Sequence, residues 1–354
     1  MDQQITLSPF TRIKRSSDVI RLGFGTASVH LNLSYEKPIF DALDMLLEGT
    51  TKADLINNLT EKYSHVVADH VLELLNKGKH IVQQSFFSNE NRYSRNKTYY
   101  HLIGGDDTAE EKIQSSHVCI IGCGGIGNLI SMGLAGLGIR KLTFIDDDNI
   151  EFSNLSRQFA FSESDVELHK ASVLSREVRK RNSNVSVNPI LTKIDCPKDL
   201  STIIPDDVDL IILSADKPEN IVFWTNDFCV KNKIAFINVG YVEDWVSFGP
   251  FFIPDQTSCY RCGQLIAKNE GLDLGGLKIV EKINSRYQVP SSPSTNTISA
   301  GMALNDIILY LGGISFPVSA NTKQFYLPNT FELKSISISR NPDCEVCGKE
   351  STSE

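Results

Sequence analysis

A strand followed by a glycine-rich turn and a helix most narrows what this chain can fold into. The apolar run 118–121 leads into the turn 122–127, Gly-Cys-Gly-Gly-Ile-Gly, and small and apolar residues continue to about Leu137. Glycines let backbone N–H groups and the amino end of a helix approach a phosphate closely. The pattern predicts the first βα unit of a nucleotide-binding parallel sheet. The glycines expected to lie against the nucleotide are Gly122, Gly124, Gly125 and Gly127.

A second strand and further apolar runs extend this unit. Residues 141–145 end in Asp146, 19 residues after Gly127, where a carboxylate can accept ribose hydroxyls. Three more apolar runs alternate with helical segments, at 185–191, 208–213 and 234–239. They predict an α/β protein with a doubly wound, mostly parallel sheet. Taken alone, these features fit a dinucleotide dehydrogenase, or glycines that serve only tight packing. The sequence GxxxxGK[ST] is absent from the chain, which excludes an ATP site of the P-loop kind.

Polar residues that follow the second strand argue against a plain dehydrogenase. The segment 146–158 contains Asp146, Asp148, Asn154, Arg157 and Gln158, and Lys170 lies 13 residues after Arg157. Hydride transfer needs no such group of cations and amides beside the phosphates. A reaction at phosphorus does, because cations offset the charge that develops on the non-bridging oxygens.

Asp216 lies just beyond the apolar run 208–213. This position is the carboxyl edge of the predicted sheet, where open α/β sheets bind their ligands. We therefore expect Asp216 to hold Mg²⁺.

Two Cys-x-x-Cys pairs predict a metal site. Cys259 with Cys262 and Cys344 with Cys347 are separated by 81 residues and together supply the four thiolates that tetrahedral zinc prefers. Four sulfur ligands leave no open position, so this zinc is expected to be structural. A redox pair is the alternative, but it would leave one pair without a role. The remaining cysteines lie in apolar stretches and are expected to be small buried side chains, namely Cys119, Cys123, Cys196 and Cys229.

Charge and hydropathy exclude several classes of protein. Lys and Arg number 35 against 43 Asp and Glu, a net charge of -8, so we expect no nucleic-acid partner and no binding to an anionic membrane. The chain has no apolar run of about 18 residues, which argues against a membrane span. Its first residues lack the basic and apolar regions of a secretory signal, and we expect a cytoplasmic protein.

Residues 1–85 predict a separate, small α+β module. Strand-like stretches at 5–15, 19–22 and 28–33 precede three short amphipathic helices, with Thr50-Thr51 and Ser64 as N-caps. A β-ribbon with three helices describes a winged-helix-like module. It carries 9 Lys and Arg against 10 Asp and Glu, so an extended peptide along the ribbon edge fits better than DNA. A dimerisation or packing appendage is the alternative.

The chain resembles the ubiquitin-activating-type (E1-like) adenylating enzymes of the ThiF and MoeB kind over about residues 91–348. The resemblance rests on the glycine turn, the segment 146–158, Lys170, Ala215-Asp216 and both cysteine pairs. It implies a Rossmann-like sheet with antiparallel strands toward the C-terminus, and the use of ATP, Mg²⁺ and structural zinc. It assigns transition-state stabilisation to Asn154, Arg157 and Lys170, and nucleotide contacts to Asp146, Asp148 and Gln158.

Other stretches are similar to the branch of this family that adenylates ribosomally made precursor peptides in microcin- and pantocin-type antibiotic biosynthesis. They are residues 91–96, 239–242 with 248–250, and 283–286. The resemblance assigns to Arg95 the role of an arginine that a neighbouring subunit inserts into the nucleotide site, which implies a homodimer. It divides the chain into a peptide-recognition module (1–85), a linker carrying Arg95 (86–111) and an adenylation domain with the zinc knuckles (112–354).

Departures from the larger family members narrow the expected chemistry. Residues 263–343 contain no cysteine that could form a thioester, and the chain stops at Glu354 without a sulfur-transfer domain. We expect neither thioester relay nor persulfide transfer. The Ser/Pro-rich loop 288–296 is either a featureless connector or a gate over the peptide end.

The expected activity is Mg-ATP-dependent adenylation of a carboxylate of a short ribosomal precursor peptide, with release of pyrophosphate. AMP then either stays on the peptide or leaves during internal cyclisation. A rival function is activation of the C-terminal Gly of a β-grasp sulfur-carrier protein, and the N-terminal module argues against it. A non-catalytic subunit is the third possibility, and the presence of Arg157, Lys170 and Asp216 together argues against that one.

Overall fold

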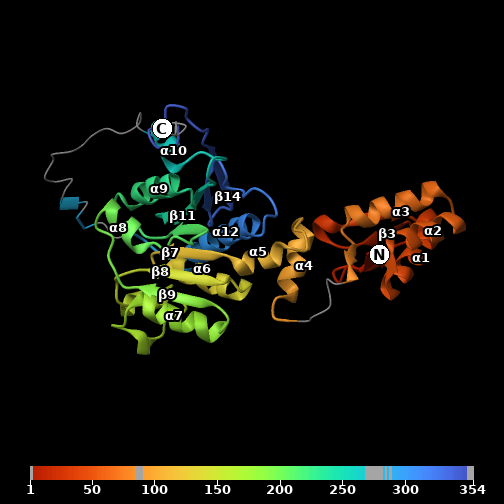
Figure 1. The fold of residues 1–354 in the computed structure, drawn as a ribbon, viewed down its shortest axis with the longest axis horizontal. Coiled ribbons are helices and arrows are strands. Elements are labelled where there is room, and N and C mark those ends of the chain that lie inside the picture. The colour runs from red at the N-terminus through yellow and green to blue at the C-terminus, as the bar shows by residue number, and fades with distance from the viewer. Residues whose placement is uncertain (1–2, 85–90, 268–281, 284, 287–288, 349–354) are drawn as a thin grey trace. The chain divides into compact units, whose positions relative to one another are not determined.

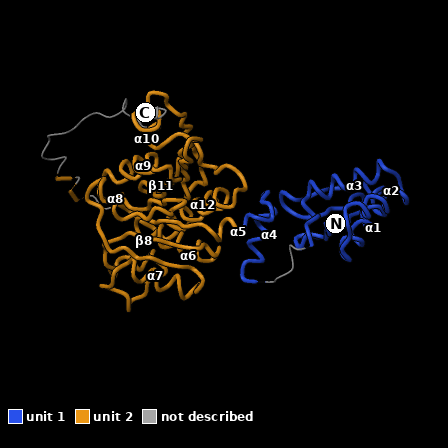
Figure 2. Tube along the Cα trace, viewed as in Figure 1, with its two compact units in different colours: residues 1–110 blue, residues 111–354 orange. Residues whose placement is uncertain are grey.

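The computed structural model describes residues 3–84, 91–267, 282–283, 285–286 and 289–348. Residues 1–110 and 111–354 form two compact units (Figures 1 and 2). No helix in the described ranges is long and apolar enough to cross a membrane.

The first unit contains two small antiparallel sheets. β2 (Ile13–Arg15), β3 (Val19–Leu22) and β4 (Val29–Asn32) form one sheet in that order, and β1 (Gln4–Leu7) pairs with β5 (Thr50–Thr51) and β6 (Ile81–Gln83) in the other. The prediction of one strand-like stretch over 5–15 was therefore wrong. Pro9 lies between the two strands, and proline lacks the N–H that a continuous ladder needs.

Three helices cover one face of the β2–β4 sheet. They are α1 (Glu36–Glu48), α2 (Lys52–Lys62) and α3 (His65–Lys77). The predicted caps are confirmed, since the Thr51 hydroxyl accepts the Asp54 N–H and the Ser64 hydroxyl accepts the Val67 N–H. Apolar side chains of the three helices enclose Ile20 and Leu22 of β3, so the sheet has one buried and one solvent-facing side. After residues 85–90, α4 (Ser94–Ile103) and α5 (Ala109–Ser115) follow.

The second unit is built on one eight-stranded sheet with the order β14-β13-β12-β11-β10-β7-β8-β9. The strands are β7 (His117–Ile121), β8 (Lys141–Ile145), β9 (Ser186–Ile190), β10 (Leu210–Leu213), β11 (Ala235–Val242), β12 (Trp245–Phe252), β13 (Thr322–Leu327) and β14 (Glu332–Ser337). Neighbours from β9 through β11 are parallel, and β12 to β14 are antiparallel. This arrangement confirms the predicted mostly parallel sheet with antiparallel strands toward the C-terminus.

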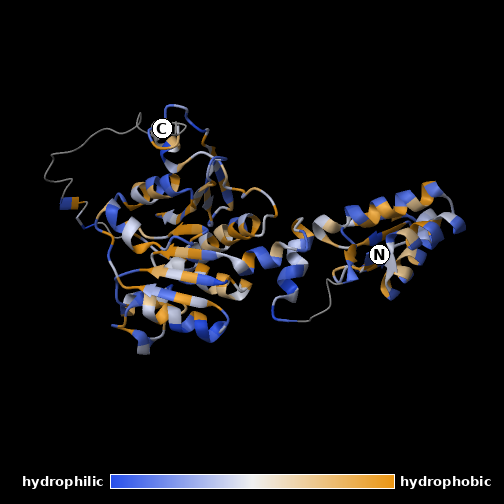
Figure 3. Ribbon diagram, viewed as in Figure 1, coloured by the Kyte–Doolittle hydropathy of each residue, from blue (hydrophilic) through white to orange (hydrophobic). Residues whose placement is uncertain are grey.

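Helices cover both faces of this sheet. α6 (Gly125–Leu137), α7 (Lys170–Arg181) and α12 (Pro293–Leu311) pack on one face, while α8 (Pro197–Ile203), α9 (Ile221–Asn232) and α10 (Tyr260–Ala267) pack on the other. Hydrophobic residues concentrate on the strands between the two layers (Figure 3). The chain runs from β7 outward to β9 and returns to β10 on the other side of β7. The sheet therefore has its topological switch point between β7 and β10, where ligands of open α/β sheets bind.

Candidate functional site

Two loops meet at the switch point, one after β7 and one after β10. The Ser214 N–H donates to the Ile121 carbonyl at 2.9 Å, and the Ser214 hydroxyl donates to the Gly122 carbonyl at 2.7 Å. Gly122 has a φ of +95°, and a Cβ there would lie 2.8 Å from the Ala215 nitrogen. Only glycine fits this turn without strain, because both its backbone angle and its contact with the second loop exclude a side chain.

Gly124 differs from the other glycines of the turn in having free space beside it. A Cβ at Gly127 would collide with the Gly122 carbonyl, and one at Gly125 would lie 2.6 Å from Asn296 Oδ1. At Gly124 the nearest atom, Gln158 Nε2, would still be 3.8 Å away. Gly124 is also the N-cap of α6 and provides no side chain to cap the helix. Packing therefore explains Gly122, Gly125 and Gly127, whereas Gly124 leaves the amino end of α6 open to an anion.

Asp146 joins the glycine turn to the end of β8. Its carboxylate accepts the Cys123 N–H at 2.6 Å on Oδ2 and the Asp148 N–H at 2.9 Å on Oδ1. Burial raises the pKa of Asp146, and the two N–H donors oppose that effect. Each carboxylate oxygen still has a lone pair available for a further donor, such as a ribose hydroxyl.

Lys170 is held at the same edge of the sheet. Its Nζ lies 2.7 Å from Asp148 Oδ2, and its side chain is 10% exposed. The Lys170 N–H also donates to the Asp148 carbonyl at 3.0 Å, so backbone as well as side chain ties the start of α7 to the loop after β8. Asp148 in turn donates its N–H to Asp146. A short series of contacts thus connects the Lys170 cation to the glycine turn.

In the segment after this loop, two predicted site residues, Asn154 and Arg157, form hydrogen bonds with residues close to them in the sequence. Asn154 is buried, and its Oδ1 accepts the Glu151 N–H at 3.1 Å within a short 3₁₀ helix, Phe152–Ser156. Arg157 Nη1 donates to the Ser153 carbonyl at 3.1 Å. Gln158 is 3% exposed, and its Oε1 has no hydrogen-bond partner among the described residues. An unpartnered buried acceptor beside Gly124 fits a ligand that donates a hydrogen bond.

Asp216 and Arg95 are both exposed. Asp216 follows the Ser214 loop at the carboxyl edge, and within the described part of the chain its carboxylate makes no hydrogen bond or ion pair. A free carboxylate at this edge fits Mg²⁺, which binds oxygen ligands and is usually held by one or two carboxylates. Arg95 lies on α4 of the first unit. The other predicted nucleotide-binding residues lie in the second unit, on the loops after β7, β8 and β10, in the first turn of α6 and at the start of α7.

Asn296 is a residue of this region that sequence reasoning placed in a loop. It lies in the first turn of α12, is 1% exposed, and donates from Nδ2 to the Ser291 hydroxyl at 3.0 Å and the Ser292 carbonyl at 2.7 Å. Its Oδ1 faces Gly125. The end of the segment 288–296 therefore contacts the glycine turn, while Gln288 lies outside the described residues. An asparagine shortly before an apolar helical stretch was the one signal available in the sequence.

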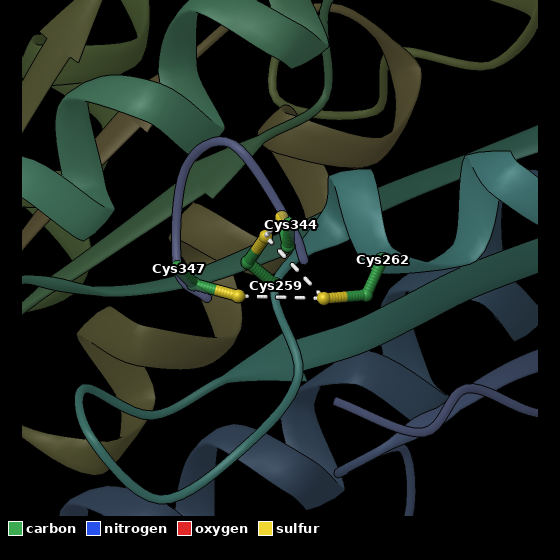
Figure 4. Close-up of side chains that lie close together, drawn as sticks. All are labelled: Cys259, Cys262, Cys344 and Cys347. Carbon is green, nitrogen blue, oxygen red and sulfur yellow. Dashed lines mark hydrogen bonds between the residues drawn. The ribbon is translucent and has the colours of Figure 1, made fainter. Parts of the chain in front are cut away.

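The four cysteines of the two Cys-x-x-Cys pairs converge on one point (Figure 4). Cys259 lies just before α10 and Cys262 lies in its first turn, while Cys344 and Cys347 come from the C-terminal loop. The four sulfurs all lie within 4.8 Å of one another. Zn–S bonds of about 2.3 Å in a tetrahedron place sulfurs roughly 3.8 Å apart. The Cys259 sulfur lies 3.9 Å from the Cys262 sulfur and 3.7 Å from the Cys344 sulfur. The set is compatible with zinc.

The surroundings of these sulfurs also favour a bound cation. All four residues are buried, and burial raises the pKa of Cys347 to about 11. Four thiolates in such a place need a compensating positive charge, which a metal ion supplies.

Among the other cysteines, Cys119, Cys123 and Cys229 are buried as predicted. Cys196 is partly exposed, because it forms the N-cap of α8.

Comparison with known proteins matches both parts of the chain. The sequence profile of the ThiF family matches residues 93–346. A crystal structure of E. coli MccB has a TM-score of 0.90 and 30% sequence identity, and the match covers 99% of this chain and 98% of that one. The structure of the microcin C7 biosynthetic enzyme MccB in complex with N-formylated MccA matches with a TM-score of 0.88 and 31% identity, over 98% of this chain and 100% of that one.

Sequence relatives extend the comparison. The molybdopterin-synthase adenylyltransferase of Escherichia coli (strain K12) is 27% identical over 70% of this chain and 93% of its own length. The structure of PaaA, at 21% identity and a TM-score of 0.69, shares the fold.

Proposed function

Because the chain belongs to the ThiF family, it is an ATP-dependent adenylating enzyme, and we propose that it adenylates a carboxylate of a short, ribosomally made precursor peptide. One observation carries the choice of substrate. The MccB structures match 98–99% of this chain, whereas the family profile begins at residue 93 and the molybdopterin-synthase relative covers 70%. The match therefore includes the N-terminal unit. One of the matched structures is a complex with N-formylated MccA, and an N-formyl group is typical of the first residue of a bacterial ribosomal product.

The proposed reaction transfers the AMP part of ATP to a carboxylate. A carboxylate oxygen of the peptide attacks the α-phosphorus of ATP, a C–O–P bond forms, and the bond from the α-phosphorus to the pyrophosphate oxygen breaks. The product is a mixed anhydride, whose AMP is a good leaving group. An amide nitrogen can then attack the activated carbonyl carbon, release AMP and close a ring.

Residues at the switch point supply the binding and the charge. In the proposed site the open amino end of α6 at Gly124 receives the phosphates, and Asp146 accepts ribose hydroxyls. Lys170, with Arg157 and Asn154, offsets negative charge on the transferred phosphoryl group. Gln158 offers its unpartnered Oε1 to the nucleoside. Asp216 would hold Mg²⁺, which neutralises phosphate charge when bound, and the four cysteines would hold structural zinc.

We also propose that the enzyme acts as a homodimer, in which Arg95 completes the site of the other subunit. The family resemblance of residues 91–96 supports this, as does the exposed position of Arg95 on α4. Mixing Arg95→Ala with Lys170→Met tests it. Each variant should be inactive alone, and the mixture should regain about a quarter of wild-type activity, because half of the dimers contain one complete site. A mixture as inactive as its components would refute the trans role.

Activation of a sulfur-carrier protein is the second candidate. The relatives named molybdopterin-synthase adenylyltransferase and sulfur carrier protein ThiS adenylyltransferase favour it, the latter at 30% identity over 48% of this chain. The two candidates differ in whether the substrate is a short peptide or a folded carrier.

Mass spectrometry of the substrate tests the main proposal. The purified chain is incubated with Mg-ATP and short peptides encoded beside its gene, and a β-grasp carrier ending in Gly-Gly is incubated in parallel. A gain of AMP on a peptide, or a loss of water with release of AMP and pyrophosphate, supports peptide adenylation and tells which product forms. Adenylation of the carrier alone would establish the second candidate instead.

A further inference from the structure

One face of the β2–β4 sheet carries a row of basic side chains. Lys14 of β2 lies directly opposite Arg21 of β3, and Arg21 lies opposite His30 of β4. Residues opposite one another in antiparallel strands project from the same face, and like charges there repel. Because Ile20 and Leu22 of β3 project into the core, Arg21 and its two neighbours project toward solvent.

Three cationic side chains lie around the Phe24 ring at the end of this row. The Arg21 guanidinium lies 4.8 Å from the centre of this ring, Lys14 Nζ lies 5.3 Å away, and the Arg12 guanidinium lies 5.5 Å away. Phe24 is 39% exposed. Arg21 is oriented further by a hydrogen bond from its Nε to the Ser28 hydroxyl at 2.9 Å. We call Arg12, Lys14, Arg21 and His30 the basic face.

Carboxylates are scarce in the stretch of sequence that forms the basic face. Between residues 12 and 32 the sequence contains one carboxylate, Asp18, which accepts a hydrogen bond from Ser17. Within the described residues, Arg12, Lys14 and Arg21 form no ion pair. Arg15, one residue from Lys14 and on the other side of β2, is paired with Glu36 at 3.1 Å. The protein thus neutralises the neighbouring arginine but leaves three cations around one phenylalanine without a counter-charge.

The strand that carries Lys14 is also open to pairing. β2 is an edge strand of the β2-β3-β4 sheet, and all three of its residues are exposed. An edge strand presents unpaired N–H and C=O groups to which an extended peptide can add as a further strand. Side chains of such a peptide alternate between the two faces, so every second one would lie beside the basic face.

We propose that the basic face binds an extended acidic peptide segment with carboxylates two residues apart. Identifying that segment with part of the precursor peptide rests on the proposed function. The precursor would then be chosen by acidic side chains, as well as by the carboxylate that is adenylated. Charge complementarity supports a peptide over a nucleic acid, because the basic face is one row of side chains wide and the whole chain has a net charge of -8.

Fluorescence anisotropy with two matched probes tests this. The full chain is titrated, without ATP, against fluorescein-labelled Gly-Thr-Glu-Thr-Glu-Thr-Gly and against the same peptide with Gln in place of Glu. The acidic probe should bind at least about tenfold more tightly at low salt, and the difference should shrink as salt is raised. Lys14→Gln and Arg21→Gln should each weaken it about fivefold. Lys77→Gln, which removes an exposed lysine of α3 in the same unit, should not.

A second measurement keeps the test independent of folding. Without peptide, Lys14→Gln should unfold at a temperature no lower than wild type, because it removes a repulsion from Arg21. Equal affinity for the two probes, or equal loss in Lys77→Gln and Lys14→Gln, would overturn the proposal, and so would tighter binding of a single-stranded oligonucleotide than of the acidic probe. If the chain binds the acidic probe selectively but adenylates no peptide, the proposed function is refuted, while the proposal that the basic face binds acidic peptides still holds.

Discussion

Lys170 Nζ lies 2.7 Å from Asp148 Oδ2, and the two side chains differ in exposure, at 10% for the lysine and 66% for the aspartate. The lysine is thus held nearly buried by a carboxylate that solvent reaches. In the proposed site a triphosphate would meet a cation whose position is already fixed, so little conformational entropy of the lysine would be lost on binding.

Lys170→Met should lower ATP–pyrophosphate exchange by about 100-fold or more, because the phosphoryl group loses a fixed positive charge. Exchange of labelled pyrophosphate into ATP measures this. Lys233→Met is the matched control, since Lys233 pairs with Asp255 at 3.0 Å and is 69% exposed. Equal activity of the two variants would contradict the role of Lys170.

Gly124→Ala should weaken ATP binding about tenfold while the melting temperature stays within about 2 °C of wild type. The added Cβ meets no protein atom within 3.4 Å, but it occupies the space left open at the amino end of α6. Calorimetric titration with ATP and thermal unfolding measure the two effects. Gly301→Ala, where a Cβ also meets nothing within 4 Å, is the control. If Gly124→Ala binds ATP like that control, the phosphates lie elsewhere.

Asp216→Ala should abolish ATP–pyrophosphate exchange and leave the fold and the zinc content unchanged. The carboxylate is exposed and supports no contact within the described chain, so its removal has no structural cost. Glu219→Ala, three residues later on the same exposed loop, should keep full exchange. Exchange retained in Asp216→Ala would remove the magnesium assignment.

Cys344→Ser should abolish binding of one zinc per chain and lower the melting temperature by at least about 5 °C, because the C-terminal loop loses its tie to α10. Elemental analysis of the purified chain and thermal unfolding check this. Cys196→Ser is the control, as Cys196 is a partly exposed helix cap outside the cluster. Wild-type protein without bound zinc, but with full stability, would contradict a structural metal.

Lys323 should make stability depend on pH. Burial lowers the pKa of Lys323 to about 8, below the value of about 10.4 in an unfolded chain. Below pH 8 both states are protonated and the cost of the buried charge is fully present. Between pH 8 and about 10.4 the folded state loses its proton first, so stability rises with pH across this window.

Lys323→Met should therefore be more stable than wild type by roughly 2 kcal/mol at pH 7, and the difference should nearly vanish by about pH 11. Urea unfolding of the second unit at both pH values measures this difference in the free energy of unfolding. Lys334→Met is the control, because the Lys334 side chain is 57% exposed. A difference that does not change with pH would mean that Lys323 keeps its proton throughout.

The sequence by itself determined the elements and much of the candidate site. The run 141–145 was predicted as a strand, and β8 has those bounds. The turn 122–127 and the two Cys-x-x-Cys pairs were recognised because their spacing is local, so the chemistry of each can be read without the fold. The adenylating activity was implied by the resemblance of these patterns, taken together, to the E1-like family.

Tertiary structure decided which distant residues touch. Ser214 bonds to Gly122 across 92 residues, and Asn296 reaches Gly125 from the start of α12. The stretch 5–15 divides between two sheets, and the basic face arises only because strand register places Lys14 beside Arg21. The hydrophobic periodicity of a sequence shows which face of a helix or strand is buried, but it does not show which other element that face packs against. Register and loop contacts are fixed by the packing of the whole sheet, and so they appear only once the chain has folded.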